Sequence, residues 1–204
     1  MLSRCAVIPL FLLAAIVGHA QKGPTVSTMA AVEVEDVSFQ RVRDSAGETW
    51  WEAAVEVRVS PRNGAVGKFA HRVQITFNLA HQSAADTTDL QFYRASVTTA
   101  VLETGRATFR FYLPPAVVAR DRLSGDARFW TVDLSIDGQA QPHNREQVAA
   151  GFSSAAAVAN FRQQLSERAP ANDGILLPWH LVPADRLPGS DPIAIRREAI
   201  ENRR

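Results

Sequence analysis

The stretch that decides the fold is residues 50–60, which read WWEAAVEVRVS. Apolar residues fill every second position, and the positions between them carry mainly charged side chains. A period of two arises when one face of a β-strand is buried and the other meets solvent. The stretch therefore predicts a half-buried antiparallel strand. The residues expected to point inward are Trp51, Ala53, Val55, Val57 and Val59.

Similar alternating or β-branched runs predict five more strands, and a phase change in the first of them predicts a β-bulge near Asp36. Six short strands separated by turns favour a mainly β, antiparallel, immunoglobulin-like two-sheet sandwich, with a small barrel as the alternative. The Cys–Trp–Cys pattern of true immunoglobulin domains is absent from the sequence. The five further runs are residues 29–42, 72–79, 90–102, 106–113 and 128–136.

Composition limits the function classes. The 204 residues are 46% hydrophobic and 21% charged, which is enough apolar material for a packed core. The net charge of +1 argues against a strongly basic nucleic-acid-binding protein. A single cysteine, Cys5, excludes a disulfide framework and a cysteine-rich metal site.

Residues 1–20, MLSRCAVIPLFLLAAIVGHA, have the pattern of a secretory signal peptide: Arg4, an apolar run, and small residues before a cut at Gln21. The apolar run is shorter than the roughly 20 residues that span a bilayer, although an uncleaved anchor is the alternative. Cleavage leaves a cysteine-free chain that depends on core burial for its stability. We therefore expect an exported protein of the periplasm or cell surface, without a stable membrane span after cleavage.

The sandwich domain is expected to span residues 21–138, and residues 139–204 change character. Residues 155–168 have apolar side chains at helical spacing and follow two serines suited to cap a helix. We expect this helix to pack on the sandwich; a docking helix for another protein is the alternative. A basic tail, residues 191–204, is expected either to be solvated or to contact an acidic partner or anionic surface.

Residues 175–183, ILLPWHLVP, are strongly apolar and contain two prolines. Burial of each large apolar side chain is worth roughly 1.5–3 kcal/mol, so such a segment is costly to leave exposed. It must therefore either wrap its own sandwich or enter a groove or sheet edge of a partner. The residues predicted to dock on a partner are Ile175, Leu176, Leu177, Trp179 and Leu181.

No catalytic or nucleotide-binding motif is present: the sequence lacks G-x-S-x-G, H-E-x-x-H, a P-loop and G-x-G-x-x-G. Its histidines are not spaced as metal ligands. These features predict a protein that is not an enzyme and has no cofactor and no metal site; a hydrolase with an unrecognised site is the weakest alternative. Trp50 and Tyr112 are expected on outward sheet faces, where two rings could stack on a glycan, so a secreted carbohydrate-binding module is a further alternative.

Three groups of residues carry a family resemblance: 92–96 (FYRAS), 111–115 (FYLPP) followed by 120–123 (RDRL), and 175–178 (ILLP). They resemble small exported pilus-like proteins encoded beside type IV pilus assembly genes in bacteria, over about residues 30–183. The resemblance implies an immunoglobulin-like sandwich and a role in a pilus or secretion apparatus, with an envelope protein as partner. A pilin is cut before its apolar helix, whereas the cut expected here follows the apolar run. We therefore expect a non-enzymatic accessory of the envelope, an interaction or structural module that does not polymerise.

Overall fold

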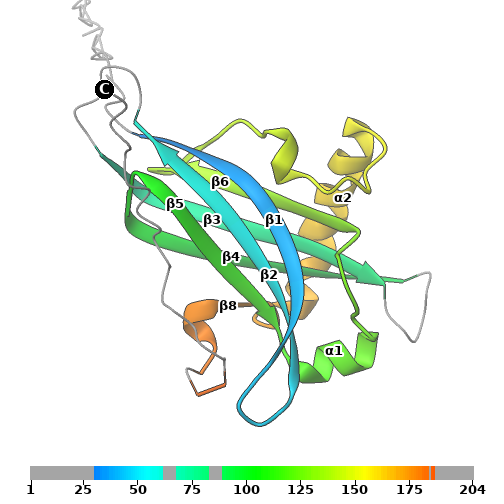
Figure 1. Cartoon of the computed structure of the whole chain (residues 1–204). Coiled ribbons are helices and arrows are strands. Elements are labelled where there is room, and N and C mark those ends of the chain that lie inside the picture. The colour runs from blue at the N-terminus through cyan, green and yellow to red at the C-terminus, as the bar shows by residue number, and fades with distance from the viewer. Residues whose placement is uncertain (1–29, 62–67, 83–88, 184, 187–204) are drawn as a thin grey trace, which may run out of the picture.

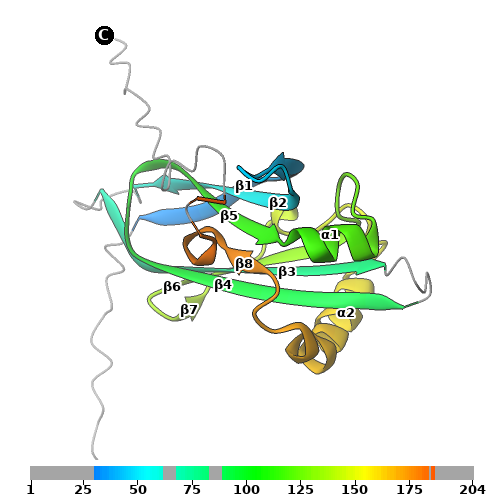
Figure 2. The same ribbon diagram turned by 90° about the horizontal axis from the view of Figure 1, so that it is seen from below.

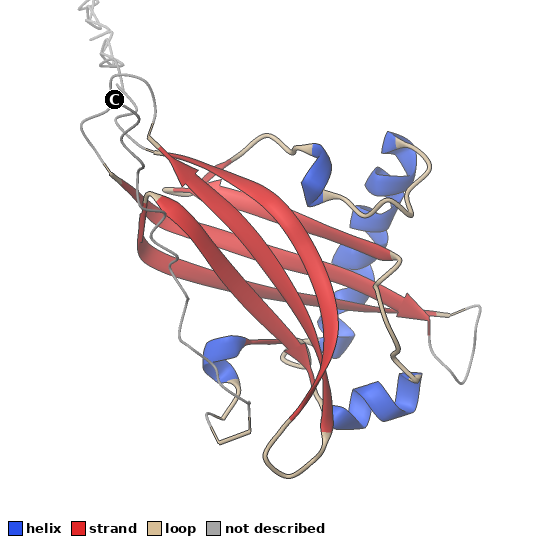
Figure 3. Cartoon of the chain, in the orientation of Figure 1, coloured by secondary structure: helices blue, strands red, loops and turns tan. Residues whose placement is uncertain are grey.

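The computed structural model describes residues 30–61, 68–82, 89–183 and 185–186. The predicted signal peptide, residues 1–20, and the basic tail, residues 191–204, lie outside these ranges. Strands dominate the described chain and form two layers that face each other (Figure 1, Figure 3).

Both layers are four-stranded antiparallel sheets. Sheet A has the order β1 (Ala31–Arg43), β2 (Thr49–Ser60), β5 (Gly105–Leu113) and β8 (Leu177–Pro178). Sheet B has the order β4 (Leu90–Glu103), β3 (Phe69–Gln82), β6 (Phe129–Ile136) and β7 (Gln139–Ala140). The predicted antiparallel sandwich is confirmed, and the alternative of a small barrel is wrong because the strands form two separate sheets.

The predicted inward residues form the core between the sheets. In β2 the side chains of Val55 and Val57 are fully buried, as the alternation requires. The pairing of β1 with β2 shifts between Val34 and Asp36, which confirms the predicted β-bulge. Phe77 of sheet B stacks on Phe111 of sheet A with ring centroids 5.4 Å apart, so aromatic contact joins the two layers directly.

Short helices close the ends and cover one face. Helix α1 (Pro115–Asp121) begins with a proline, which suits the first helical turn. Helix α2 (Ala155–Arg168) is capped by the Ser154 hydroxyl, which accepts a hydrogen bond from the Ala157 backbone N–H at 3.2 Å. Phe161 and Leu165 of α2 pack on Phe92 and Ala80 on the outer face of sheet B, so the predicted packing of this helix is confirmed (Figure 2).

The sandwich extends beyond the expected boundary at residue 138. Asp137 and Gly138 have φ values of 50° and 76° and turn the chain from β6 into β7. Farther on come three 3-10 turns, η1 (Arg145–Gln147), η2 (Ala169–Asn172) and η3 (Trp179–Leu181), with β8 between the last two. Residues after 138 therefore supply a strand to each sheet. Among the helices in the described ranges, none is long and apolar enough to cross a membrane.

Candidate functional site

Residues 175–183 form what we call the strap, which passes the side of the sandwich where β4 and β5 lie (Figure 2). Leu176 enters the main core and is 2% exposed. Leu177 and Pro178 pair with Tyr112 and Phe111 as strand β8. Of the two arrangements expected for this apolar segment, the described structure therefore has the one in which it wraps its own sandwich.

The strap also covers the two rings that were expected to stack on a glycan. Trp50 and Tyr112 share the outer face of sheet A, as predicted, with ring centroids 6.5 Å apart and planes at 86°. They are 7% and 3% exposed because Val182, Leu177 and Trp179 pack against them. Neither ring offers an open face, so a sugar could stack on them only after the strap had moved away.

The end of the strap is fastened to the turn between β1 and β2. The buried Asp44 carboxylate accepts hydrogen bonds from the backbone N–H groups of Ala46 (3.0 Å) and Glu48 (2.8 Å). The Trp50 indole N–H donates to the same carboxylate at 3.2 Å. Arg186 Nη1 lies 3.5 Å from Asp44 Oδ2 and 3.3 Å from Glu48 Oε2. Asp44 thus links the turn, the covered ring of Trp50 and the chain beyond the strap.

This link predicts a loss of stability in acid. Burial alone would raise the pKa of the Asp44 carboxyl, but hydrogen bonds from Trp50, the Glu48 and Ala46 N–H groups and Arg186 together lower it. A carboxyl whose pKa is lower in the folded than in the unfolded state stabilises above the unfolded value of about 3.9, and the benefit is lost as pH falls through the folded pKa. We expect the urea concentration at the unfolding midpoint to be lower at pH 3 than at pH 6.

The Asp44→Asn variant should have a lower midpoint than the wild-type protein at pH 6, and its midpoint should decrease less between pH 6 and pH 3. An equal decrease in the two proteins would contradict this role of Asp44.

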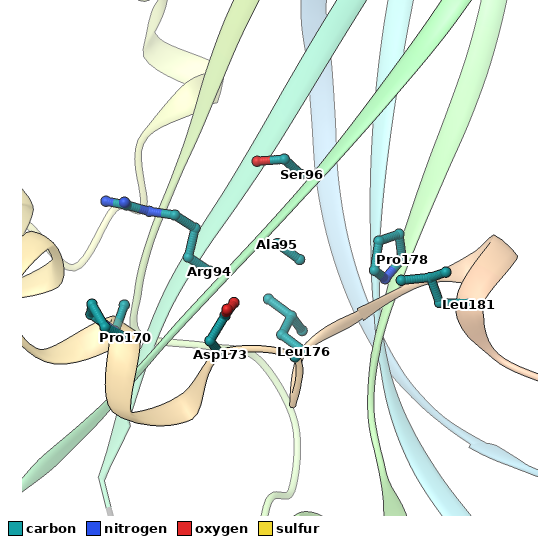
Figure 4. A pocket seen from close by; sticks show the side chains of 10 residues that line it. Arg94, Ala95, Ser96, Pro170, Asp173, Leu176, Pro178 and Leu181 are labelled. Carbon is teal, nitrogen blue, oxygen red and sulfur yellow. The ribbon is translucent and has the colours of Figure 1, made fainter.

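Beside the strap lies a hollow of about 470 Å³, which we call the β4 groove (Figure 4). Its floor is apolar and includes Ala95 and Leu176, which also belong to the core. Its rims bring together sheet B, η2 and the strap. The labelled lining residues are Arg94, Ala95, Ser96, Pro170, Asp173, Leu176, Pro178 and Leu181.

The backbone of β4 is open along this groove. β4 is the terminal strand of sheet B, and the Phe92 carbonyl points outward and accepts a hydrogen bond from Asn172 Nδ2 at 3.0 Å. Hydrogen-bonding direction alternates along an antiparallel strand, so the N–H and C=O groups of Arg94 and Ser96 point outward as well. Within the described ranges, no strand pairs with this edge. The edge is therefore geometrically suited to accept an added extended backbone.

Polar side chains of opposite charge stand on the rims. Arg94 is exposed, and its guanidinium Nε donates to Asn78 Oδ1 at 3.1 Å, which orients the side chain. Asp173 is exposed on the η2 side of the groove. Leu181 is 59% exposed at the strap side. The groove thus combines an apolar floor, one cation, one anion and an open strand edge.

A second polar cluster, which the sequence did not predict, joins β4 to α1. Arg120 donates to both carboxylate oxygens of Asp121, at 2.8 and 2.6 Å, and Tyr93 Oη donates to Asp121 Oδ2 at 3.2 Å. Burial and the Asp121 charge raise the pKa of Tyr93 to about 12, and burial lowers the pKa of the nearby His81. Because Arg120 already engages both oxygens of the carboxylate, we assign this cluster to the stability of the α1 end. No motif spacing marks it in the sequence.

A third cluster lies on the outer face of sheet B beside α2. Asp133 Oδ1 contacts His143 Nε2 at 2.9 Å and Arg162 Nη2 at 3.0 Å, and Asn78 Nδ2 donates to its other oxygen at 2.7 Å. Asp137 pairs instead with Arg72 at 3.0 Å, so the two aspartates near the end of β6 do not share a site. Over the described part of the chain, no group of three or more His, Cys, Asp and Glu side chains is placed to hold a metal ion.

Among known proteins, this chain has only distant structural similarity. No protein-family model matches the chain, and no curated protein matches it. A crystal structure of a protein from Akkermansia muciniphila matches with 13% sequence identity and a TM-score of 0.48, covering 58% of this chain and 74% of that one. Structural similarity this distant does not indicate what the protein does.

Proposed function

We propose that this chain is a non-enzymatic, exported interaction module of the bacterial cell envelope that binds an extended polypeptide segment in the β4 groove. The single observation that supports the proposal most is the open edge of β4, where the backbone groups of Arg94 and Ser96 face an apolar-floored groove. In β-strand addition, backbone hydrogen bonds supply affinity and pockets for alternate side chains supply specificity. The β4 groove offers both kinds of contact.

The lining indicates what kind of segment fits. An apolar side chain of the bound segment would meet Leu176 and Pro178 on the floor and wall. Arg94 favours an acidic side chain and Asp173 a basic one, and the two lie on the side of the groove across from Pro178 and Leu181 (Figure 4). Among the residues predicted to dock, Leu181 keeps a direct role because its side chain is mostly exposed. Leu176 forms part of the floor, while Ile175, Leu177 and Trp179 hold the strap in place.

The cellular setting of the proposal comes from the sequence. The signal-like pattern of residues 1–20 supports export, and the strings at 92–96, 111–115, 120–123 and 175–178 support a pilus-like or secretion system. A partner strand from an envelope protein of such a system is the ligand that the proposal names. It requires neither nucleic acid nor a cofactor.

Site-specific photocrosslinking tests the proposal. A photoreactive phenylalanine analogue at Ser96, in protein exported by its own N-terminal segment, should give a discrete adduct with an envelope protein. The matched control places the same analogue at Thr108, on the outer face of sheet A away from the groove. The mass of the purified protein from the same cells should correspond to a chain beginning at Gln21. Equal labelling from Ser96 and Thr108, or no discrete adduct, would contradict the proposed site.

A proline substitution identifies the binding mode. Ser96→Pro removes an N–H that faces the groove, whereas Val97→Pro removes one that should bond to β3. Ser96→Pro should therefore leave the far-ultraviolet circular dichroism unchanged and abolish a crosslink placed at Leu181. Val97→Pro should lose the fold. An undiminished crosslink in folded Ser96→Pro would exclude β-strand addition at this edge.

A further inference from the structure

A second hollow, of about 600 Å³, is lined by the end of β1, the start of β2, and helix α1 with the residues that follow it. Figure 1 shows α1 beside the turn between β1 and β2, at one end of the sandwich. Small-molecule sites usually have volumes of roughly 300–1,000 Å³. We call this site the α1 hollow. Its lining shares no residue with that of the β4 groove, so it can be tested independently of the proposed function.

Two arginines from different elements line the α1 hollow. Arg41 belongs to β1, and Arg122 directly follows α1. Both are exposed, and neither forms an ion pair with another side chain in the described part of the chain. The acidic residue of the lining, Glu48, is paired with Arg186 at 3.3 Å. The α1 hollow therefore has two guanidinium groups whose positive charges are not balanced by an ion pair.

The backbone of Arg122 has a conformation that favours glycine. Its φ of 52° and ψ of 42° lie in the left-handed region, and its N–H donates to the Val118 carbonyl at the end of α1. A residue with a side chain is less stable than glycine in this region, although a positive charge at the end of a helix offsets part of the cost. Backbone strain of this kind often occurs at binding sites. Here it places an arginine in the lining of the hollow.

Apolar side chains adjoin the two arginines. Val118 and Leu123 line the hollow and are themselves buried, and the Leu123 N–H donates to the Val118 carbonyl at 3.0 Å. Thr49 and Ser124 add hydroxyl groups, which are hydrogen-bond donors. A guanidinium group recognises a carboxylate through two parallel N–H donors. A carboxylate attached to a hydrocarbon chain therefore matches both the charged and the apolar part of this lining.

We propose that the α1 hollow binds the carboxylate of a small amphiphile, such as a medium-chain fatty acid. Arg41 and Arg122 hold the carboxylate, and Val118 and Leu123 contact the hydrocarbon chain. A head group with a single negative charge fits better than a dianionic phosphate, because Glu48 lies in the same lining and repels further negative charge. This site gives the protein a small-molecule ligand in addition to the polypeptide segment of the β4 groove.

Titration of the isotopically labelled, purified exported protein with sodium octanoate tests the site, with the amide NMR signals of Leu123 and Ser124 as reporters. Octanoate should shift these signals saturably, and its dissociation constant should rise as salt is added. Arg41→Gln and Arg122→Gln should each raise the dissociation constant by about tenfold, because each removes a charge-assisted hydrogen bond. Arg145→Gln changes an exposed arginine on η1 and should leave it unchanged.

Two further comparisons test the ligand class and the role of Arg122. Acetate has the charge without the chain, and octanol has the chain without the charge, so each should bind at least about tenfold more weakly than octanoate. Arg122→Gly should bind octanoate as weakly as Arg122→Gln but unfold at a higher urea concentration, since glycine relaxes the backbone.

Three results would overturn the proposal. The first is the absence of saturable shifts at Leu123 and Ser124 with octanoate. The second is a dissociation constant that Arg145→Gln raises as much as Arg122→Gln does, or that Arg122→Gly leaves at the wild-type value. The third is acetate or octanol binding as tightly as octanoate. None of these results affects the crosslink at Ser96, which tests the proposed function separately.

Discussion

Replacing Leu176 by alanine is expected to lower the free energy of unfolding by about 2–4 kcal/mol, while Leu181→Ala should change it by less than about 0.5 kcal/mol. The two leucines lie five positions apart in the same strap, but their side chains are 2% and 59% exposed. Truncation of the buried Leu176 side chain leaves a cavity in the core, whereas truncation of the exposed Leu181 side chain leaves none. Urea unfolding followed by tryptophan fluorescence at neutral pH measures both changes.

The same pair of variants separates a structural role from a docking role. Leu181→Ala should weaken the photocrosslink from Ser96 while the protein keeps its full stability. Leu176→Ala should lose crosslinking together with stability, because Leu176 belongs to the core as well as to the floor of the groove. If Leu181→Ala were as destabilising as Leu176→Ala, the Leu181 side chain would belong to the core. Its assignment to the rim of the β4 groove would then be wrong.

The strands could be predicted because alternation is a local property of the chain. In β2, Trp51 and Val55 point inward in the structure as the period of two requires, and the phase change at Asp36 identified the bulge. Strand β8 could not be predicted in this way. Leu177 and Pro178 form only two paired positions, which is too short for any period, and their partners on β5 lie more than sixty residues earlier. The placement of the strap therefore depends on tertiary packing.

The candidate site was likewise only partly predictable. The composition of residues 175–183 shows that this segment is apolar and needs burial, but the sequence cannot distinguish the buried Leu176 from the exposed Leu181. Arg94 and Asp173 meet at the β4 groove from positions about eighty residues apart, with no shared motif. Trp50 was correctly placed on an outer face, yet its cover by Leu177, Trp179 and Val182 depends on tertiary packing that has no sequence signature.

The strings that carry the family resemblance have physical roles in this fold. Tyr93 belongs to the first string and Arg120–Asp121 to the second, and the two meet in one buried hydrogen-bonded cluster. The third string supplies Leu176 to the core and Leu177 to β8. A shared need for this packing would explain the resemblance at the level of the fold. The pilus-like setting itself is a proposal that the crosslinked partner would identify.

Replacing Arg120 by alanine should lower the free energy of unfolding by about 2–3 kcal/mol, because it strips a buried carboxylate of its main partner. The Asp121 side chain is 1% exposed, and its remaining side-chain hydrogen bond would come from Tyr93. Removing one member of a fully buried ion pair costs about 3–5 kcal/mol, and we expect less here because the Arg120 side chain is 49% exposed. Tyr93→Phe should cost only about 1 kcal/mol, since Arg120 would still satisfy the carboxylate.

A second substitution distinguishes lost charge compensation from lost packing. In the Arg120→Ala background, Asp121→Asn removes the uncompensated charge while nearly preserving the shape of the side chain, so it should recover part of the lost stability. If stability fell only because the packing of the Arg120 methylenes was lost, the asparagine would recover nothing. Recovery would show that the α1 end is held by neutralising a buried carboxylate, which is a stabilising role.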